Sequence, residues 1–243
     1  MPEITLYQFA ADDGTESASP FCVKVHRALG LKGLSYKVRN VFSPKELSRL
    51  NPDHKKLPVL EVDGERIIDS TEIIKYLDAN YSENQILGDD QPWFVGMLED
   101  WADASLYWFA VYYRWQVSEN FEPFSKRAFA TLPAALRWFV PGLVRKKTLK
   151  SLHAQGIGRF SESDVREQLR GHLAHLDRLL GENEWMSGSK IGAADLAIFP
   201  LVRQFALASM PQCRPLVLEH ERLNSWLKAV DAKTSTEHTV AVA

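Results

Sequence analysis

The pattern of apolar and polar residues changes character about a third of the way along the chain. Over residues 1–82, short stretches rich in β-branched and aromatic residues alternate with stretches of helical period. This part predicts strands at 4–9, 34–41, 57–62 and 66–69, and helices at 20–33, 43–50 and 70–81. The expected order is β-α-β-α-β-β-α. The first two strands should pair in parallel through their helix, and the last two should form a hairpin at Asp63-Gly64.

Helical period dominates the rest of the chain. Apolar and small residues recur at steps of three and four over residues 91–119, which predicts a long helix with an aromatic stripe. The later pattern predicts helices at 125–155 (interrupted by Pro133 and Pro141), 163–181, 191–207 and 220–230. The third of these is nearly all apolar and should be buried, and the tail after Lys233 should be disordered. We therefore expect an α/β domain over 1–82 and an all-helical domain over 91–243.

Composition and charge limit the kinds of partner and the compartment that we expect for this protein. The net charge is −2, so no overall basic excess would attract nucleic acid or a membrane, and we expect neither as a partner. The longest apolar run, residues 139–144, is far shorter than the ~20 residues of a membrane span. The first residues read directly as a strand and not as a signal peptide. Two cysteines cannot make a disulfide framework, so the simplest compartment is a reducing cytosol.

Two places in the first domain suit a peptide ligand. A proline that opens an interior strand is awkward unless Leu57-Pro58 is cis, which would turn the backbone of Leu57 outward to pair with an extended peptide. Asp69 and Ser70 stand where a strand ends and a helix begins, so they could hold an ammonium and a carboxylate. The plain alternative is that Ser70 only caps the helix and Asp69 only ends the strand.

The stretch Ser19-Pro20-Phe21-Cys22 allows three interpretations. It is a helix start with proline at the first helical position. It also resembles a CxxC redox motif whose first cysteine is serine, and Cys22 in the first turn would favour a thiolate. However, the second position of such a motif is usually the less exposed one. The third interpretation is that Ser19 activates the thiol of a bound ligand.

Longer stretches carry a family resemblance. "SPFCVKVHRALGLKGLSYKV" and "NPDHKKLPVLEVDGERIIDSTEIIKYLDANY" resemble the thioredoxin-fold domain of glutathione transferases, with the tau class closest. Residues 156–199 are similar to the C-terminal domain of the metaxin and failed-axon-connections group. The resemblance covers most of residues 1–208 and is weak in the proline-interrupted middle. It implies a thioredoxin-like domain followed by an all-α domain, glutathione as co-substrate, no metal, and a homodimer.

The resemblance implies roles for six residues. Ser19 matches the serine that activates the glutathione thiol, and Leu57 before Pro58 matches the residue whose backbone holds the cysteinyl part. Lys56 matches a lysine that contacts the glycine end. Asp69 and Ser70 match the acidic-Ser pair that binds the γ-glutamyl group, although the tau class usually has Glu at the first position.

Three positions depart from the family pattern. The loop from Tyr7 to Ser19 is longer than usual, which makes the placement of Ser19 an open question. Ser43 stands near the place of a second lysine often found after the second strand. Gly192 replaces the Ser or Thr that usually caps the buried helix, while Asp195 remains as the carboxylate of that capping box.

The electrophile should lie beside the thiolate, against the helical domain. The lining expected there is aromatic and would select apolar electrophiles: Phe21, Tyr107, Trp108, Tyr112 and Trp115. The alternative is that most of these rings belong to the core. Tyr7 ends the first strand, where other classes of the family place a catalytic tyrosine. His172 and His175 stand three residues apart without an evident third ligand, so we expect no metal site.

The leading hypothesis is a cytosolic glutathione transferase with a role in detoxification, which takes glutathione and a small apolar electrophile. A binding or scaffold protein on the same fold, with weak or no catalysis, is the second hypothesis. A glutathione-dependent thiol-redox or peroxidase activity of Cys22 is the third.

Overall fold

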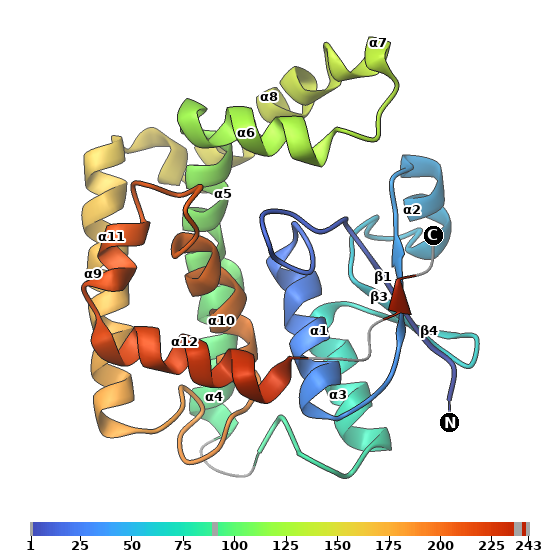
Figure 1. Ribbon diagram of the computed structural model, residues 1–243, viewed down its shortest axis with the longest axis vertical. Helices are drawn as coiled ribbons and strands as arrows, with labels where there is room; N and C mark the ends of the chain where they lie inside the picture. The colour runs from blue at the N-terminus through green and yellow to red at the C-terminus, as the bar shows by residue number, and fades with distance from the viewer. Residues whose placement is uncertain (1, 89–91, 236–239, 242–243) are drawn as a thin grey trace.

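The computed structural model describes residues 2–88, 92–235 and 240–241, and it places an α/β unit beside a helical unit (Figure 1). The sheet has the order β4-β3-β1-β2-β5. Its strands are β1 (Ile4–Gln8), β2 (Lys37–Asn40), β3 (Val59–Val62), β4 (Glu65–Ile68) and β5 (Val240–Ala241). β1 pairs with β2 in parallel and with β3 antiparallel, and β3 and β4 form the hairpin.

Three helices complete the α/β unit: α1 (Pro20–Leu31), α2 (Pro44–Leu50) and α3 (Ser70–Asn80). The predicted order β-α-β-α-β-β-α and the thioredoxin-like fold are confirmed. Figure 1 shows α1 and α3 between the sheet and the helical unit. Apolar side chains of both helices are fully buried against the sheet, among them Leu29, Ile73 and Leu77. This burial is the main stabilising term of the unit.

A buried histidine joins three elements of this unit. His26 of α1 lies 2.6 Å by Nε2 from Gln8 Oε1 of β1, and 2.6 Å by Nδ1 from the hydroxyl of Tyr36, which precedes β2. Burial lowers the pKa of His26 to about 4, so the ring is neutral at physiological pH. The imidazole therefore holds α1 in register with the two parallel strands.

The helical unit follows. Its elements are α4 (Pro92–Trp101), the π-helix η1 (Ala102–Leu106), α5 (Tyr107–Trp115), α6 (Ser118–Ala128), α7 (Ala134–Arg137), α8 (Val140–Gln155), η2 (Ile157–Arg159), α9 (Glu162–Glu182), α10 (Ala193–Phe205), α11 (Arg214–Leu218) and α12 (Glu221–Thr234). As predicted, α10 is the central helix, and every residue of it except Arg203 is buried. Across the described residues, no helix combines the length and the apolar character that crossing a membrane requires.

Two sequence predictions need correction. The expected regular helix over 91–119 ends at Trp115 and contains the π-helical segment η1, whose wider turn changes the phase of the residues on either side. The tail after Lys233 is not disordered where the structure describes it. α12 continues to Thr234, and β5 pairs with Lys37 and Val38 of β2. Positions 236–239 and 242–243 of that tail, and position 91 of the long helix, lie outside the described residues.

The structure explains why glycine stands at the start of α10. Asp195 accepts hydrogen bonds from the amides of Gly192 (3.0 Å), Met186 (2.8 Å) and Ser187 (3.1 Å), so the carboxylate half of the capping box is present. A Cβ at Gly192 would lie 2.8 Å from the carbonyl oxygen of Ile86 and 2.9 Å from Ser187 Oγ. The segment that connects the two units therefore occupies the space that a Ser or Thr side chain would need.

Candidate functional site

The Ser19 hydroxyl lies at the start of α1 and does not cap its own helix. Ser19 is the N-cap residue, with extended backbone and Pro20 at the first helical position, yet its side chain makes no capping hydrogen bond. Its backbone N–H donates to Ser17 Oγ at 3.2 Å. A serine at this position usually bonds a free amide of the first turn. This one does not: the Ser19 side chain instead hydrogen-bonds the Cys22 thiol in the same turn, so a ligand at the helix N-terminus would compete with that weak contact.

The long loop before Ser19 closes on itself. At its base, Ser17 Oγ donates to the Phe9 carbonyl at 2.7 Å, and the Ala18 amide donates to the Ala10 carbonyl at 2.8 Å. Gln8 Nε2 donates to the Glu16 carbonyl at 2.9 Å. The extra residues are thus accommodated within the loop, and Ser19 returns to the end of β1. The additional length does not carry the serine away from the sheet.

Basic side chains of the helical unit hold this loop from the other side. Arg127 of α6 pairs with Asp12 at 2.6 Å, and Arg203 of α10 pairs with Glu16 at 2.9 Å. Ser209 also contacts Asp13. The sequence carried no signal for these contacts, because the partners are more than one hundred residues apart.

Arg114 of α5 reaches the residue next to Ser19. Its Nη1 donates to the carbonyl of Ala18 at 2.6 Å, and its guanidinium lies 5.0 Å from the ring centre of Phe124. Burial lowers the pKa of the guanidinium, while nearby Asp12 opposes that shift. Its Nε is buried without a hydrogen-bond partner among the described residues. Arg114 is therefore a positive group beside the Ser19 turn that the sequence analysis missed.

The two rivals of Ser19 are buried. Burial raises the pKa of the Cys22 thiol to about 11, although hydrogen bonding from Ser19 opposes the rise, so only about one thiol in 10⁴ is ionised at pH 7. Cys22 has no exposed surface. Tyr7 is 6% exposed, and its hydroxyl donates to Glu61 Oε1 at 3.3 Å. Neither group is placed to attack or activate a ligand.

The expected cis bond is present between Leu57 and Pro58. Asn51 organises the turn that leads to it, because its Nδ2 donates to the Lys56 carbonyl at 3.0 Å and its Oδ1 accepts from the His54 amide at 3.0 Å. Leu57 packs in the same small apolar cluster as Cys22 of α1. The start of α1 and this turn are therefore neighbours. Lys56 is exposed and makes no ion pair within the part of the chain described.

Asp69 and Ser70 begin α3 in different roles. Asp69 has φ 81°, a left-handed conformation that is rare outside glycine, and its side chain accepts from the Thr71 amide at 2.9 Å. Asp69 is thus the capping residue as well as an exposed carboxylate. Ser70 is 3% exposed, and its hydroxyl has no hydrogen-bond partner among the described residues. A strained capping residue beside an unpartnered hydroxyl is typical of a binding site.

A buried ion cluster lies behind Thr71. Lys24 of α1 contacts Glu99 of α4 at 2.6 Å and Asp103 of η1 at 3.0 Å, while Thr71 Oγ1 donates to Glu99 at 2.7 Å. Burial raises the pKa of Asp103, and Lys24 opposes that rise. Two carboxylates share one ammonium group, and Asp69 adds a third close by. The start of α3 therefore carries an excess of negative charge that suits a ligand ammonium.

The structure brings together three of the five aromatic side chains predicted to line the electrophile site. The rings of Phe21 and Tyr107 are 4.9 Å apart, and Tyr107 lies 5.6 Å from Trp108. Phe21 belongs to the first turn of α1, next to Ser19, so these rings bring an aromatic surface to the junction of the two units. Phe9, which follows β1, is 41% exposed and was missed by the sequence analysis.

The other two aromatic residues pack within the helical unit. Tyr112 is 2% exposed and packs against Tyr113. Trp115 packs against Phe121 and Phe124 of α6, with ring centres 5.6 and 5.2 Å away. They share a helix face with Trp108, but α6 covers the end of that face. Tyr112 therefore matches the alternative that the rings belong to the core, whereas half-buried Trp115 is directed to α6 and away from Phe21 and Tyr107.

His172, the first of the histidine pair, packs on aromatic rings. Its ring centre lies 5.4 Å from that of Trp101 and 5.2 Å from that of Phe109. Burial lowers its pKa, with a further contribution from His175. The imidazole is therefore a packing group of the helical unit.

Comparisons with known families match both units. Residues 17–85 match the family described as glutathione S-transferase, N-terminal domain, and residues 155–229 match glutathione S-transferase, C-terminal domain. The unmatched stretch between them contains α4 to α8, where the sequence resemblance was weakest.

Two similar protein sequences and one similar solved structure show the range of proteins that this chain resembles. The chain is 28% identical to an isoprene-epoxide–glutathione S-transferase of Rhodococcus sp. strain AD45, across 86% of this chain and 88% of the relative. It is also 28% identical to the Drosophila melanogaster protein Failed axon connections, across 88% of this chain and about half (52%) of that protein. A tau-class glutathione S-transferase structure from mango superposes with a TM-score of 0.61 at 18% identity, over 96% of this chain and 93% of that one.

Proposed function

Because the chain belongs to the glutathione S-transferase superfamily, we propose that it is an enzyme that joins the thiolate of glutathione to small apolar electrophiles. The observation that carries the proposal is the Ser19 hydroxyl, which stands at the N-terminus of α1 and makes no capping hydrogen bond to an amide of that helix. Ser19 acts as a hydrogen-bond donor to the glutathione sulfur and not as a nucleophile.

The energetics of this role are sufficient without a basic side chain. A free thiol with a pKa near ~8.5 is only about 3% thiolate at pH 7. Lowering that pKa by about two units requires ~2.7 kcal/mol of selective stabilisation of the thiolate. A hydroxyl that donates to a charged acceptor supplies ~1.5–3 kcal/mol, and a helix N-terminus adds ~0.3–1 kcal/mol. Ser19 at the start of α1 offers both.

The proposed glutathione site runs from the start of α3 to the Lys56 turn. Ser70 and the first amides of α3 would bind the γ-glutamyl carboxylate, and Asp69, supported by the negative cluster behind it, would bind the ammonium. The Leu57 backbone before Pro58 would pair with the cysteinyl part, and Lys56 would reach the glycine carboxylate. Each end of the tripeptide then meets a group of opposite charge.

The proposed electrophile site is the aromatic surface beside Ser19. Phe21, Tyr107 and Trp108 meet there, and Phe9 is exposed at the end of the neighbouring strand. Apolar rings favour apolar electrophiles. The thiolate sulfur would form a bond to the electrophilic carbon while the halide leaves, or while an epoxide ring opens and its oxygen takes a proton from water.

Two measurements test the proposal together. Retention on immobilised glutathione measures binding, and conjugation of an aryl halide or a small apolar epoxide measures catalysis; the Rhodococcus relative is itself named for an epoxide. We expect retention and conjugation. Retention without conjugation would instead support a binding protein, the second hypothesis. If glutathione is neither retained nor conjugated, the enzyme hypothesis fails.

A redox role for Cys22 predicts a different result. Disulfide or peroxide reduction that disappears in Cys22→Ser would support it, whereas the burial of the thiol leads us to expect unchanged rates. We further propose a homodimer and a reducing cytosol, where a detoxifying conjugation would take place. The two cysteines are buried and form no disulfide with each other.

A further inference from the structure

The segment from Ser125 to Ser151, here called the arm, projects from the helical unit and touches the rest of the protein mainly at its base. It contains the end of α6, all of α7 and most of α8, and it forms the uppermost projection in Figure 1. None of its residues is buried. Because folding stability comes mainly from burial, a projection with no buried residue needs another reason for its sequence.

The charge of the arm differs in sign from that of the rest of the protein. The arm contains seven Lys and Arg residues and no Asp or Glu. Since the net charge of the whole chain is −2, the remainder carries −9. No membrane partner was expected from the sequence, because the net charge of the whole chain is close to zero. That value is the sum of a positive arm and a negative remainder.

Most of this positive charge is not neutralised within the protein. Arg127 pairs with Asp12, and Arg145 donates to the carbonyls of Trp115 and Gln116. The other five basic side chains are exposed and make no ion pair with any described residue; they are Lys126, Arg137, Lys146, Lys147 and Lys150. The arm therefore presents uncompensated positive charge to any partner.

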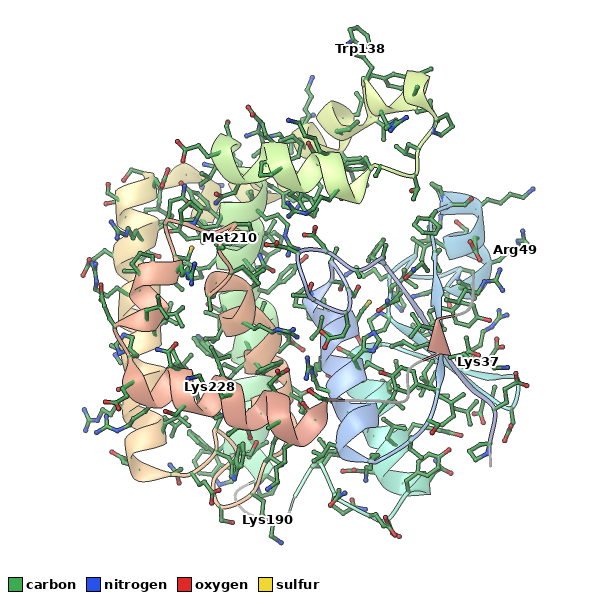
Figure 2. The ribbon with its side chains drawn as sticks, in the orientation of Figure 1. Lys37, Arg49, Trp138, Lys190, Met210 and Lys228 are labelled. Carbon is green, nitrogen blue, oxygen red and sulfur yellow. The ribbon has the colours of Figure 1, made fainter. Side chains whose placement is uncertain are left out.

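Large apolar side chains occupy the tip. Trp138 is 90% exposed and Leu143 is 61% exposed, and Leu136 and Phe139 are also exposed. Figure 2 shows Trp138 pointing outward from the end of the arm, away from the rest of the molecule. Along α8, Leu143 is followed on the same helix face by Lys146, Lys147 and Lys150, at steps of three, four and seven. An apolar tip thus continues into a row of lysines.

We propose that the arm docks the protein on an anionic lipid surface, with Trp138 and Leu143 in the interface and the lysines of α8 at the headgroups. Clusters of lysine are attracted to anionic headgroups, and tryptophan favours the headgroup level. The positive charge of the arm is complementary to anionic lipid, while the negative remainder is repelled and faces away. A convex, projecting tip can enter a fluid bilayer, whereas a protein partner would need a pocket of matching shape.

This inference is independent of the proposed glutathione chemistry, and cosedimentation of the whole protein with vesicles tests it. We expect binding to phosphatidylcholine vesicles that contain about 30% phosphatidylserine, and much weaker binding to phosphatidylcholine alone. Raising the ionic strength from about 0.1 M to about 0.5 M should release the protein, because salt screens the lysines.

Matched variants separate the arm from general charge and hydrophobicity. The triple variant K146Q/K147Q/K150Q should bind roughly 100-fold more weakly, whereas K45Q/K190Q/K228Q, with the same change in net charge outside the arm, should bind like the wild type. Figure 2 shows Lys190 and Lys228 far from Trp138. L143S should bind roughly 10-fold more weakly, whereas L218S, at a leucine of similar exposure (56%), should not change binding.

Fluorescence locates the contact. The chain has seven tryptophans, and the blue shift of their emission on adding anionic vesicles should disappear in W138F. The proposal is overturned if the wild type does not bind these vesicles, or if both triple variants lose binding equally. It is also overturned if the arm lysines affect only the binding of an oligonucleotide, or only concentration-dependent self-association measured by light scattering.

Discussion

At the scale of single residues, the role proposed for Ser19 depends on its hydroxyl and its helix acting on the same atom, the sulfur of a bound thiol. The hydroxyl is spared from capping, and the loop before it closes so that the serine returns to the end of β1. Cys22, three residues later, is turned into the core. One helix turn therefore holds a hydroxyl donor at its start and a buried thiol, and we expect the hydroxyl to exchange its contact with Cys22 for the sulfur of a bound ligand.

Replacing this serine tests its role directly. We predict that Ser19→Ala raises the pKa of the thiol of bound glutathione by one to two units, roughly 1.4–2.7 kcal/mol, while retention on immobilised glutathione persists. The loss of a donor to the thiolate is the physical reason. Thiolate absorbance as a function of pH measures the shift, with Ser151→Ala, at an exposed serine of α8, as the control. An unchanged pKa would remove Ser19 from the mechanism.

Arg114 should act on the same turn through its charge and through the Ala18 carbonyl. We predict that Arg114→Met raises the pKa of the bound thiol by about one unit, and that Arg114→Lys restores roughly half of the shift by keeping the charge. The same titration measures both variants. If the Lys variant behaves like the Met variant, the hydrogen bond to Ala18 is the important contribution. If neither moves the pKa, Arg114 only supports the fold.

At the scale of elements, the neutral His26 joins α1 to β1 and to the start of β2. Its pKa of about 4 is below the ordinary 6.5 of the unfolded chain, so protons bind preferentially to the unfolded state as the pH falls from 6.5 to 4. The stabilising contribution of the neutral ring is present above pH 6.5 and is lost over that range. At pH 5 this single group should lower the free energy of unfolding by about 2 kcal/mol relative to pH 7.

We therefore predict that His26→Gln flattens the acid side of the stability profile. Urea unfolding at pH 7 and pH 5 should show a difference between the two pH values that is about 2 kcal/mol smaller in the variant than in the wild type. His54→Gln, at an exposed histidine, is the control and should keep the wild-type difference. The quantity compared is the difference in the free energy of unfolding between pH 7 and pH 5, so the test holds even if the variant is less stable at both pH values. An equal difference in wild type and variant would contradict the proposal that the buried His26 ring is neutral.

Elements and order in this protein could be predicted because they depend on local periodicity. The strands around Leu6 and Val59, the buried helix α10 and the cis bond before Pro58 all follow from nearby residues. The predictions that were wrong depend on how separate helices and strands pack against each other. Trp115 lies on the same helix face as Trp108 and is equally half-buried, and only the packing of α6 decides that Trp115 contacts Phe121 and Phe124.

The candidate site shows the same division. Asp69 and Ser70 are visible in the sequence because a strand end and a helix start coincide there. The partners of the loop before Ser19 are not, because Asp12 and Arg127 meet only after both units have folded. The π-helical turn that places Asp103 against Lys24 also has no local signature in the periodicity.

At the scale of the whole molecule, α4 leaves an apolar pair uncovered. Trp93 is 70% exposed and Met97, one turn later, is 56% exposed. Such neighbours on a helix are typical of a protein interface. They give the expected homodimer a physical basis, since a second copy would remove this area from water.

We predict that the double variant W93E/M97E weakens dimerisation at least about 30-fold, because it places charges where an apolar contact of ~2 kcal/mol or more is expected. Light scattering over a range of protein concentrations measures the assembly. L218S, at an exposed leucine of α11, is the control and should leave the wild-type assembly intact. A wild type that is monomeric at every concentration would show that this face has another use.

The ion pairs and hydrogen bonds between the loop before Ser19 and the helical unit have a consequence for protein engineering. Exchanging whole domains between relatives is a common way to transfer specificity, and the boundary near residue 85 would appear to be a natural place to cut. Here the helical unit supplies Arg114, Arg127 and Arg203 to the loop that positions the serine. We expect a chimera that takes its helices from a relative without these arginines to lose the alignment of Ser19, whatever electrophile its new helices would accept. The exchange should therefore succeed only when the loop travels with the helices that hold it.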